Sequence, residues 1–410
     1  MAVKRKDPKS HALNDGETYR KSDGRYMYRY YSEDKKRHAV YAADLNELRE
    51  KEAKIQEDLR KGIRVGEDQI TLNQVYQLWK RDKRNLKQTT YGNYVYMYEH
   101  FIEPEFGCRK LKKIKKSDIR HLYNGLLDAK KMKVNTLDNI HTVLHQVFNV
   151  AIDGGYISVN PTDRVMAECK RAHNIDIPRR HALTIPQQAA FIQYISATEK
   201  YQHWLPLFTF FLGTGCRVSE VVGLRWQDVN MDKGYIEINH NMVYYQREKN
   251  QCYFSITTPK TKAGNRMIPM LSEVKDALIN ERKYQFKQGI RCNATIDGYS
   301  DFIFLNRYGM PHNPQTINRT IKRITLNYNE IELERAEKEK REPILLPNFS
   351  CHNLRHTFCT RYCENESNLK VIQEIMGHKD IATTMEIYAE ATSEAKVKSF
   401  GNLEGKIRIS

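Results

Sequence analysis

The sequence predicts a multidomain protein that is mainly α-helical and contains small β-sheets. Its 410 residues are too many for one core, because domains hold about 150 residues each. The composition changes near residues 62–68 and again at 171–183, which is typical of linkers. The hydrophobic pattern is strand-like before the first linker, helical between the two and mixed after the second. We therefore expect a sheet plus helix at 1–66, a four-helix bundle at 67–170 and a mixed α/β domain at 171–410.

The composition indicates a folded protein whose partner is polyanionic. Apolar residues make up 40% of the chain, while 67 Lys and Arg against 50 Asp and Glu give a net charge of +17. This surplus favours nucleic acid over an anionic membrane. No apolar run is long enough to span a bilayer, and the first ten residues lack the apolar core of a secretory signal. The eight cysteines form no C-x-x-C pair or disulfide framework, as expected for reduced thiols of a cytosolic protein.

The N-terminal segment reads as a small sheet followed by a helix. Its first fifteen residues are basic and polar, and we expect them to form a flexible arm. Tyr- and Val-rich pieces, "GRYMYRYYS" and "RHAVYAA", predict strands, and Asp44 is placed to cap a charged helix that runs to about Lys61. Surface exposure is the simpler interpretation of any one strand tyrosine. The sharper hypothesis is a sheet face that enters a DNA groove, with Arg25 and Arg29 among its contacts.

Four helices are predicted between residues 70 and 165. The first has apolar residues at i, i+3, i+4 and i+7, beginning at Leu72, and the second runs from Thr89 to Phe106. The third and fourth show the same spacing at 119–126 and 137–151, and "NPTDRV" ends the bundle.

A basic segment, "CRKLKKIKK", lies between the second and third of these helices. Six of its nine residues are basic. A solvated face is the default interpretation, but the overall positive charge makes a phosphate-contacting surface an equal one. The predicted contacts are Arg109, Lys110, Lys112, Lys113, Lys115 and Lys116.

The remainder of the chain alternates helices with strands. Helices are expected at about 185–198 and 202–213, and again from about Ser272. Between them, "KGYIEIN", "MVYYQ", "CYFSITTPK" and "NRMIPM" predict strands. Lys260 and Lys262 fall at a turn between two of these strands, where a hairpin tip could place an ammonium group against a phosphate; a solvated loop lysine is the simpler alternative.

Two short motifs carry arginines suited to bind a phosphate. In "TGCRVSE", Arg217 opens a helix after a glycine turn, where backbone N–H groups also attract anions, and Glu220 lies one turn on, where it could hold the arginine. In "CHNLRHTF", His352 and Arg355 lie three residues apart on one helix face. Arginine clamps two oxygens and histidine moves a proton, although either motif alone would be weak evidence.

The segment "IMGHKDIATTMEIYAEAT" ends a helix at Gly377 and begins another after Asp380. His378 lies in the turn between them. Tyr388 follows ten residues later, at a spacing that by itself predicts a core tyrosine. His356, Cys359 and Cys363 share one helix face, but no second pair of ligands accompanies them, so we expect core cysteines and no metal site.

Taken in order, these motifs resemble the tyrosine recombinase (phage integrase) family. "TGCRVSE", "HNLRHTF" and "IMGHKDIATTMEIYAEAT" are similar to its signature segments, and the resemblance is strong over roughly residues 174–392. The bundle at 70–165 resembles the core-binding domain of that family. The N-terminal sheet plus helix, together with "IDGYSDFIFLNR", resembles integrases of conjugative transposons, also called integrative and conjugative elements, whose first domain binds arm sites.

The resemblance implies a chemical role for each motif residue. Tyr388 would attack a DNA phosphodiester to give a 3′-phosphotyrosine, while Arg217 and Arg355 neutralise the phosphate. His352 would accept the tyrosine proton and His378 would donate a hydrogen bond to the phosphate. Lys260 would protonate the leaving 5′-oxygen, with Lys262 as the alternative, and Glu220 has a supporting role.

The same resemblance implies how the protein works as an assembly. We expect it to bind core and arm sites on double-stranded DNA, in the bacterial cytoplasm and in association with the nucleoid. A tetramer would exchange strands through a Holliday junction, with C-terminal tails passing between subunits and with an accessory excision factor. Neither a metal nor any other cofactor is expected, because the phosphotyrosine bond keeps the energy for rejoining.

Two other functions fit the same chemistry or fold. A type IB topoisomerase-like enzyme would cleave and religate DNA without bringing two sites together, although a separate arm-binding domain argues against it. A non-catalytic DNA-binding regulator could also keep this fold, but the full set of catalytic residue types argues against a dead homologue.

Overall fold

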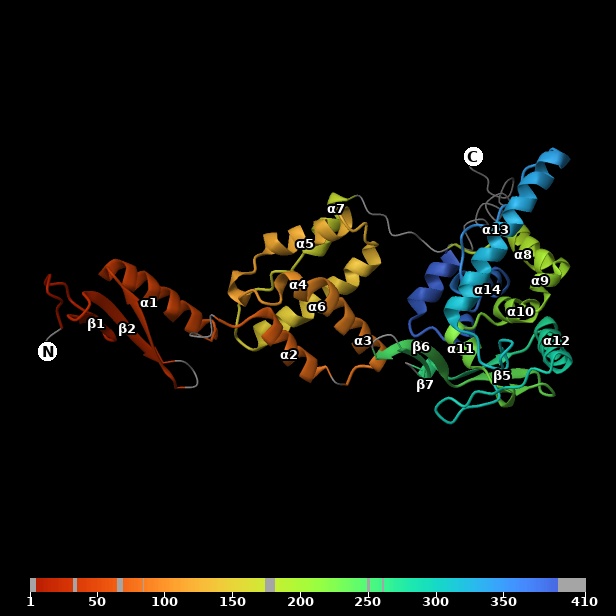
Figure 1. The fold of residues 1–410 in the computed structure, drawn as a ribbon, viewed down its shortest axis with the longest axis horizontal. Helices are drawn as coiled ribbons and strands as arrows, with labels where there is room; N and C mark the ends of the chain where they lie inside the picture. Colours follow the sequence, from red (N-terminus) through yellow and green to blue (C-terminus); the bar gives the residue numbers. More distant parts are fainter. Residues whose placement is uncertain are drawn as a thin grey trace, which may run out of the picture. The chain divides into compact units, whose positions relative to one another are not determined.

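The computed structural model describes residues 5–31, 35–64, 69–83, 85–173, 181–248, 251–259 and 262–389. The chain divides into two compact units, Met1–Ile177 and Pro178–Ser410 (Figure 1). Within the described residues, none of the helices combines the length and the apolar character needed to cross a bilayer.

The first unit begins with an antiparallel sheet of order β1-β2-β3 and one helix. These elements are β1 Glu17–Arg20, β2 Arg25–Tyr31, β3 Arg37–Ala42 and α1 Leu45–Arg60. The Asp44 side chain accepts a hydrogen bond from the Asn46 amide, so α1 begins where the sequence predicted. The sheet has one strand more than the two expected segments, because the short β1 was not recognised as a strand of its own.

Three of the four tyrosines of β2 form the core of this sheet, which corrects the simpler interpretation that they are exposed; only Tyr31, at the end of the strand, is exposed. Tyr26, Tyr28 and Tyr30 are buried and pack with residues of α1, since alternate residues of a strand face the same side. Arg25 and Arg29 lie at the alternate positions and are exposed. The arginines predicted to contact DNA therefore share the face of β2 that α1 does not cover.

Residues 5–13 do not form the flexible arm that we expected. Leu13 belongs to the core of the sheet, and the buried Asp7 accepts a hydrogen bond from the Tyr26 hydroxyl at 2.5 Å. The sequence analysis missed this contact because the segment is mainly basic and polar, and Asp7 gave no local sign that it would bind Tyr26 of the sheet.

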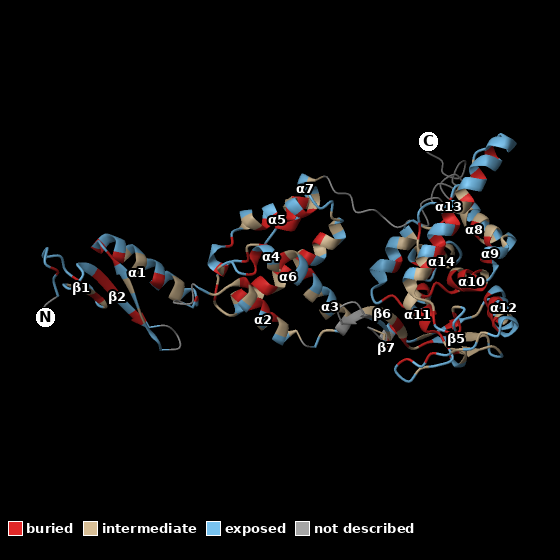
Figure 2. Ribbon diagram, viewed as in Figure 1, coloured by how far each residue is buried: buried red, intermediate tan, exposed pale blue. Residues whose placement is uncertain are grey.

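A helical bundle follows in the same unit. Its helices are α2 Leu72–Asp82, α3 Gln88–Met97, α4 Glu103–Phe106, α5 Lys116–Asp128, α6 Val134–Asp153 and α7 Val165–Ala172. A π-helical turn, Tyr98–Ile102, joins α3 to α4, so the predicted second helix is continuous. Figure 2 shows buried residues along one side of these helices and exposed residues along the other.

The last helix of the bundle, α7, was not expected. The sequence predicted that the bundle ends at residues 160–165, but Val165, Met166 and Cys169 are buried against it. Arg164, which precedes α7, has a left-handed φ of 62° and makes no capping hydrogen bond, so the usual start signal is missing. The predicted boundary between residues 170 and 171 falls inside this helix.

The second unit surrounds an apolar helix, α10, with further helices and two small sheets. The helices are α8 Ile185–Ala197, α9 Glu199–Gln202, α10 Leu205–Thr214, α11 Val218–Gly223, α12 Ser272–Gln288, α13 Pro314–Glu339, α14 Cys351–Asn365 and α15 Leu369–Met376. The strands are β4 Val229–Asn230, β5 Tyr235–Ile238, β6 Asn241–Glu248, β7 Gln251–Thr257 and β8 Arg266–Pro269. Residues 381–389 are also helical.

These five strands form two sheets and not one. One sheet has the order β4-β5-β8, and β6 pairs with β7 as a separate hairpin. The segment between β7 and β8, which contains Lys260 and Lys262, therefore passes from one sheet to the other. The predicted hairpin tip is wrong, because β7 pairs with the strand before it and β8 pairs with β5.

Candidate active site

Two glycine turns bring separate elements of the second unit together. Gly215 ends α10 with φ +60° and Gly377 ends α15 with φ +62°, a conformation that side-chain-bearing residues rarely adopt. A Cβ at Gly377 would lie 2.9 Å from the Ala263 carbonyl oxygen and 3.0 Å from Nη1 of Arg266. The turn after α15 can therefore lie against the start of β8 only because residue 377 has no side chain.

Arg217 links the start of α11 to the end of α15. Its backbone N–H donates to Oε2 of Glu220 at 2.8 Å, and its Nη1 donates to Oε1 of the same carboxylate at 2.8 Å. Its Nη2 donates to the carbonyl of Gly377 at 2.8 Å. The side chain remains 37% exposed, so its other N–H groups can reach a ligand from solvent. The predicted pairing of Arg217 with Glu220 is present.

A second arginine that the sequence analysis did not single out binds the same carboxylate. Nη1 and Nη2 of Arg266 donate to the two oxygens of Glu220 at 3.0 and 2.9 Å. Its Nε donates to the carbonyl of Ile375 at 2.7 Å, and its side chain is only 5% exposed. The segment "NRMIPM" reads as a strand, and no local signal showed that its arginine would meet residues so distant in the sequence.

Arg355 is the third arginine of the site. It is buried on α14, where Nη1 donates to the carbonyl of Gly215 at 2.7 Å and Nη2 to that of Met376 at 2.6 Å. The carbonyls of residues 375, 376 and 377 thus each accept from a different arginine. A helix C-terminus carries partial negative charge, which favours cations at this place. We call Arg217, Arg266 and Arg355 the arginine cluster.

The arginine cluster carries more positive charge than its one carboxylate neutralises. Burial raises the pKa of Glu220, but the Arg266 hydrogen bonds and the charges of the three arginines outweigh it and lower that pKa to about 2. Burial, followed by the charge of Arg217, lowers the pKa of Arg355 to about 10. Three guanidinium groups around one carboxylate leave a surplus of positive charge that an anion would relieve.

His378 lies beside this cluster in a neutral form. Burial, followed by the charges of Arg355 and Arg217, lowers the pKa of His378 to about 3. Its Nδ1 lies 3.0 Å from the hydroxyl of Thr384. An Nδ1 that accepts from this hydroxyl leaves the ring proton on Nε2, which can then donate to a ligand.

His352 lies on the exposed first turn of α14, one turn before Arg355. Its charge also contributes to the lowered pKa of His378, so the two histidines act on one another across the site. The structure therefore brings His352 and His378 into the same electrostatic environment.

Tyr388 lies on the helix formed by residues 381–389. Asp380 begins that helix, with its Oδ1 accepting from the Ala382 amide at 3.0 Å, as the sequence predicted. The Tyr388 ring packs against a small core cluster that includes Cys359, Cys363 and Met376. The apolar packing predicted from its spacing is present, although the residue is only half-buried.

The segment that carries the two candidate lysines lies close to the arginine cluster. Lys260 falls outside the described residues, and only the backbone of Lys262 is described, at the start of the short 3-10 helix Lys262–Gly264. The carbonyl of Gly264 accepts from Nη1 of Arg266 at 3.4 Å. This hydrogen bond places the backbone of the lysine-bearing segment beside the arginine cluster.

The predicted DNA contacts lie on the surface of the first unit. Arg109, Lys112, Lys113 and Lys115 are exposed and Lys110 and Lys116 are half-buried, while the intervening Leu111 and Ile114 enter the core. Some of these cations already have acidic partners, such as Lys116 with Glu168 at 2.6 Å and Arg25 with Asp23 at 3.0 Å.

The cysteines of α14 have a structural role. Cys359 and Cys363 are buried among apolar side chains. Across the described residues, no group of three or more His, Cys, Asp or Glu side chains is arranged to hold a metal ion.

Three family patterns match the sequence in succession. "DNA binding domain of tn916 integrase" matches residues 1–59, "Phage integrase, N-terminal SAM-like domain" matches 71–127, and "Phage integrase family" matches 183–395.

Curated relatives match over nearly the whole chain. The "Transposase from transposon Tn1545" of Streptococcus pneumoniae is 31% identical and covers 98% of this chain and 97% of its own length. The "Transposase from transposon Tn916" of Enterococcus faecalis is 30% identical with the same coverage.

Solved structures match as well. The Tn1549 transposon integrase in complex with transposon right end DNA has a TM-score of 0.69 at 27% identity, covering 82% of this chain and 100% of that one. A lambda integrase tetramer bound to a Holliday junction, with a TM-score of 0.53 at 18% identity, shares the fold over 91% of this chain and 94% of its own.

Proposed function

This chain belongs to the phage integrase family of tyrosine recombinases, and we propose that Tyr388 is its nucleophile. The predicted resemblance and fold class are confirmed. The protein is a site-specific DNA recombinase that integrates and excises a mobile element. The assignment of each catalytic step to a residue of this chain is our proposal, and it rests on the arginine cluster above all.

The arginine cluster is suited to hold the scissile phosphate. Within the described residues, Arg217 and Arg355 each donate two of their five side-chain N–H groups to protein acceptors, and the partly exposed Arg217 keeps others for a ligand. Since the carbonyls and Glu220 hold the guanidiniums in place before DNA binds, little rearrangement is needed as charge builds on the phosphate. Arg266 does not act on the phosphate but positions Glu220 and the end of α15.

The protons move between the tyrosine, the histidines and a lysine. A tyrosine hydroxyl ordinarily has a pKa of about 10, so attack by Tyr388 at neutral pH requires a base, which we assign to His352. Tyr388 then bonds to phosphorus, the bond to the 5′-oxygen breaks, and Lys260 or Lys262 protonates that oxygen. His378 donates from Nε2 to a non-bridging oxygen.

The two N-terminal segments would hold the substrate duplex. We propose that residues 1–66 bind arm sites through the sheet face with Arg25 and Arg29, and that the helical bundle, which includes α7, binds core sites through the basic segment at 108–116. The second unit, Pro178–Ser410, would form the catalytic domain. Recombination then proceeds through a Holliday junction in a tetramer on DNA, with exchange of the C-terminal tails, an accessory excision factor and association with the nucleoid as further parts of the proposal.

A nicked suicide substrate tests the nucleophile. Wild-type protein should become covalently attached to a core-site duplex whose short cleaved strand diffuses away, while Tyr388→Phe should not. Tyr362→Phe, which removes a hydroxyl from a neighbouring aromatic residue of the same region, is the matched control and should retain attachment. If wild type forms no adduct, or Tyr388→Phe forms one equally well, the assignment is wrong.

Two further assays separate the remaining alternatives. A 5′-thio leaving group needs little protonation, so it should restore cleavage to whichever of Lys260→Ala and Lys262→Ala lacks the general acid. Joining of two site-bearing duplexes, as opposed to relaxation of supercoils alone, distinguishes a recombinase from a topoisomerase-like enzyme.

A further inference from the structure

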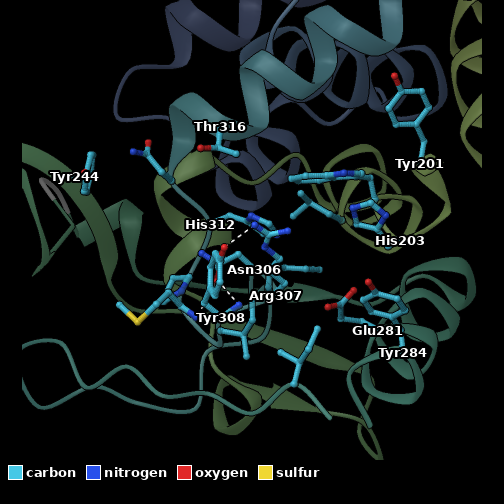
Figure 3. A pocket seen from close by; sticks show the side chains of 18 of the residues that line it. Tyr201, His203, Tyr244, Glu281, Tyr284, Asn306, Arg307, Tyr308, His312 and Thr316 are labelled. Atoms are coloured by element: carbon cyan, nitrogen blue, oxygen red, sulfur yellow. Dashed lines mark hydrogen bonds between the residues drawn. The ribbon is translucent and has the colours of Figure 1, made fainter. Parts of the chain in front are cut away.

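A cavity of about 760 Å³ lies in the second unit between α12, the start of α13 and the β6–β7 hairpin. Its volume falls within the range of small-molecule sites, about 300–1,000 Å³. Neither Tyr388 nor any member of the arginine cluster lines it. Figure 3 shows the Glu281 carboxylate beside the Tyr284 ring, across the cavity from Asn306 and Tyr308.

The inner wall contains a buried carboxyl group, that of Glu281. This residue is 5% exposed, and its Oε1 accepts a hydrogen bond from Nε2 of Gln285 at 2.7 Å. The same Nε2 also donates to the carbonyl of Ile303, so the two hydrogen bonds fix the orientation of this amide nitrogen. Among the described residues no Lys, Arg or His forms an ion pair with Glu281. A carboxylate has about four acceptor positions, and most of these remain available to a ligand in the cavity.

Flat rings surround this carboxyl group. Trp204 and Phe304 are buried in the wall, and Tyr284 stacks with His203 at 6.0 Å between ring centroids. The Trp204 ring lies 4.6 Å from that of His312. Aromatic side chains of this kind bind planar heterocycles by stacking.

The mouth of the cavity is positively charged. Lys200, Arg307 and Arg323 line it and are exposed, and Arg307 lies over the Tyr308 ring at 4.7 Å. None of these three cations is paired with Glu281, so the carboxyl group and the cations meet different parts of a ligand. A molecule that fits has a planar base with N–H donors at one end and an anionic group at the other.

We propose that this cavity binds a guanine nucleotide, with the base between the aromatic walls and the phosphate at the basic mouth. Guanine presents adjacent N–H donors, from its ring and its exocyclic amine, which match two acceptor positions of the Glu281 carboxylate. The other bases do not offer two adjacent donors to one carboxylate. The nucleotide is either free in solution or an unpaired guanosine of a DNA strand, and both carry the same two groups.

Equilibrium dialysis of the full-length protein against radiolabelled dGMP at pH 8, where the Glu281 carboxyl group is ionised, tests this proposal. Wild type should bind one dGMP per chain saturably, deoxyguanosine more weakly, and deoxyribose 5-phosphate without saturation. Glu281→Gln should weaken dGMP binding by about tenfold or more, because it removes a charged hydrogen-bond acceptor. Glu273→Gln, an exposed carboxylate on the same helix, should have no effect. Absence of saturable binding to wild type, or equal binding by Glu281→Gln, would overturn the proposal.

Two controls complete the design. Arg307→Gln with Arg323→Gln should weaken dGMP but not deoxyguanosine, whereas Arg335→Gln, on α13 outside the cavity, should change neither. All these variants should still form the Tyr388 adduct, which shows that they fold and separates this proposal from the catalytic one.

A displacement experiment identifies the source of the nucleotide. If a duplex with one unpaired dG displaces dGMP and the fully paired duplex does not, the source is the DNA strand. If neither duplex displaces dGMP, the source is the free nucleotide. Equal binding of all four nucleotides contradicts the guanine assignment.

Discussion

Glu220 is the residue on which the geometry of the arginine cluster depends, because one buried carboxylate binds both Arg217 and Arg266. Replacing it with glutamine leaves these cations with a neutral partner. Removing one partner of a buried ion pair costs about 3–5 kcal/mol. The expected consequence is loss of both stability and cleavage, since Arg217 also loses its orientation.

The pH dependence of stability tests Glu220 directly. Its folded-state pKa of about 2 lies below the ordinary 4.5, so its contribution is fully present above pH 4.5 and is lost as the pH falls towards 2. Denaturant titrations should show Glu220→Gln less stable than wild type by about 3 kcal/mol at pH 7 and by progressively less as the pH falls below 4.5. A difference that stays constant with pH would contradict the ionised, paired carboxylate.

Glu281 should show the opposite dependence. Burial raises the pKa of Glu281 to about 7 from 4.5, so the folded state favours the neutral acid and wild type loses stability as the pH rises from 4.5 to 7. Glu281→Gln lacks this ionisation, so its stability relative to wild type should increase across that pH range by up to about 3 kcal/mol. Thermal unfolding of both proteins at pH 5 and pH 8 measures this difference in stability. A relative stability that does not change between these two values would show that the carboxyl group is not buried as described.

The turn after α15 shows how one element positions the site. Gly377→Ala adds a Cβ to a left-handed residue and brings it against Ala263 and Arg266, so we expect cleavage to fall at least tenfold and unfolding free energy to fall by more than about 2 kcal/mol. The suicide-substrate assay and denaturant unfolding measure the two effects.

Gly289 supplies the matched control for this substitution. It ends α12 with φ +66°, and a Cβ at this position would meet no other atom within 4 Å, so Gly289→Ala experiences the backbone strain alone. Gly289→Ala should lower the free energy of unfolding by about 1–2 kcal/mol and leave cleavage unchanged. Equal effects of the two alanines would show that close packing at Gly377 does not matter.

Elements with local signals were predictable from sequence, and those that depend on distant partners were not. Asp44 and Asp380 mark helix starts because capping involves the next two residues alone. The route from β7 to β8 was misjudged because strand pairing with β5 joins residues about 30 apart. Arg217, Arg355 and His378 also have partners far away in the sequence, and only the family resemblance of their motifs predicted them together with Glu220. Arg266 was missed because it lies in a strand segment that carries no such motif.

At the scale of the whole molecule, a net charge of +17 predicts DNA binding that weakens steeply with salt. Replacing Arg25 and Arg29 with glutamine should lower the slope of log K against log salt by about 1 per removed charge on an arm-site duplex. Cleavage of a core-site substrate should be unchanged. Filter binding across a salt series measures the slope.

A matched pair on the other face of the N-terminal sheet controls for charge alone. Lys54 and Arg60 are exposed on α1, so Lys54→Gln with Arg60→Gln removes the same charge from the face that we do not expect to meet DNA. If both double variants change the slope equally, the attraction is a general property of net charge and the sheet face has no special role.

The contacts between the arginines and the end of α15 also bear on how the protein can evolve. Backbone carbonyls at residues 375–377 hold the three guanidiniums, so the amino acids at 375 and 376 can be exchanged for others that keep the helix without changing the groups that the arginines bind. Residue 377 has no such freedom. Active natural variants should therefore carry hydrophobic substitutions at residues 375 and 376, in the last turn of α15. The same variants should keep glycine at position 377.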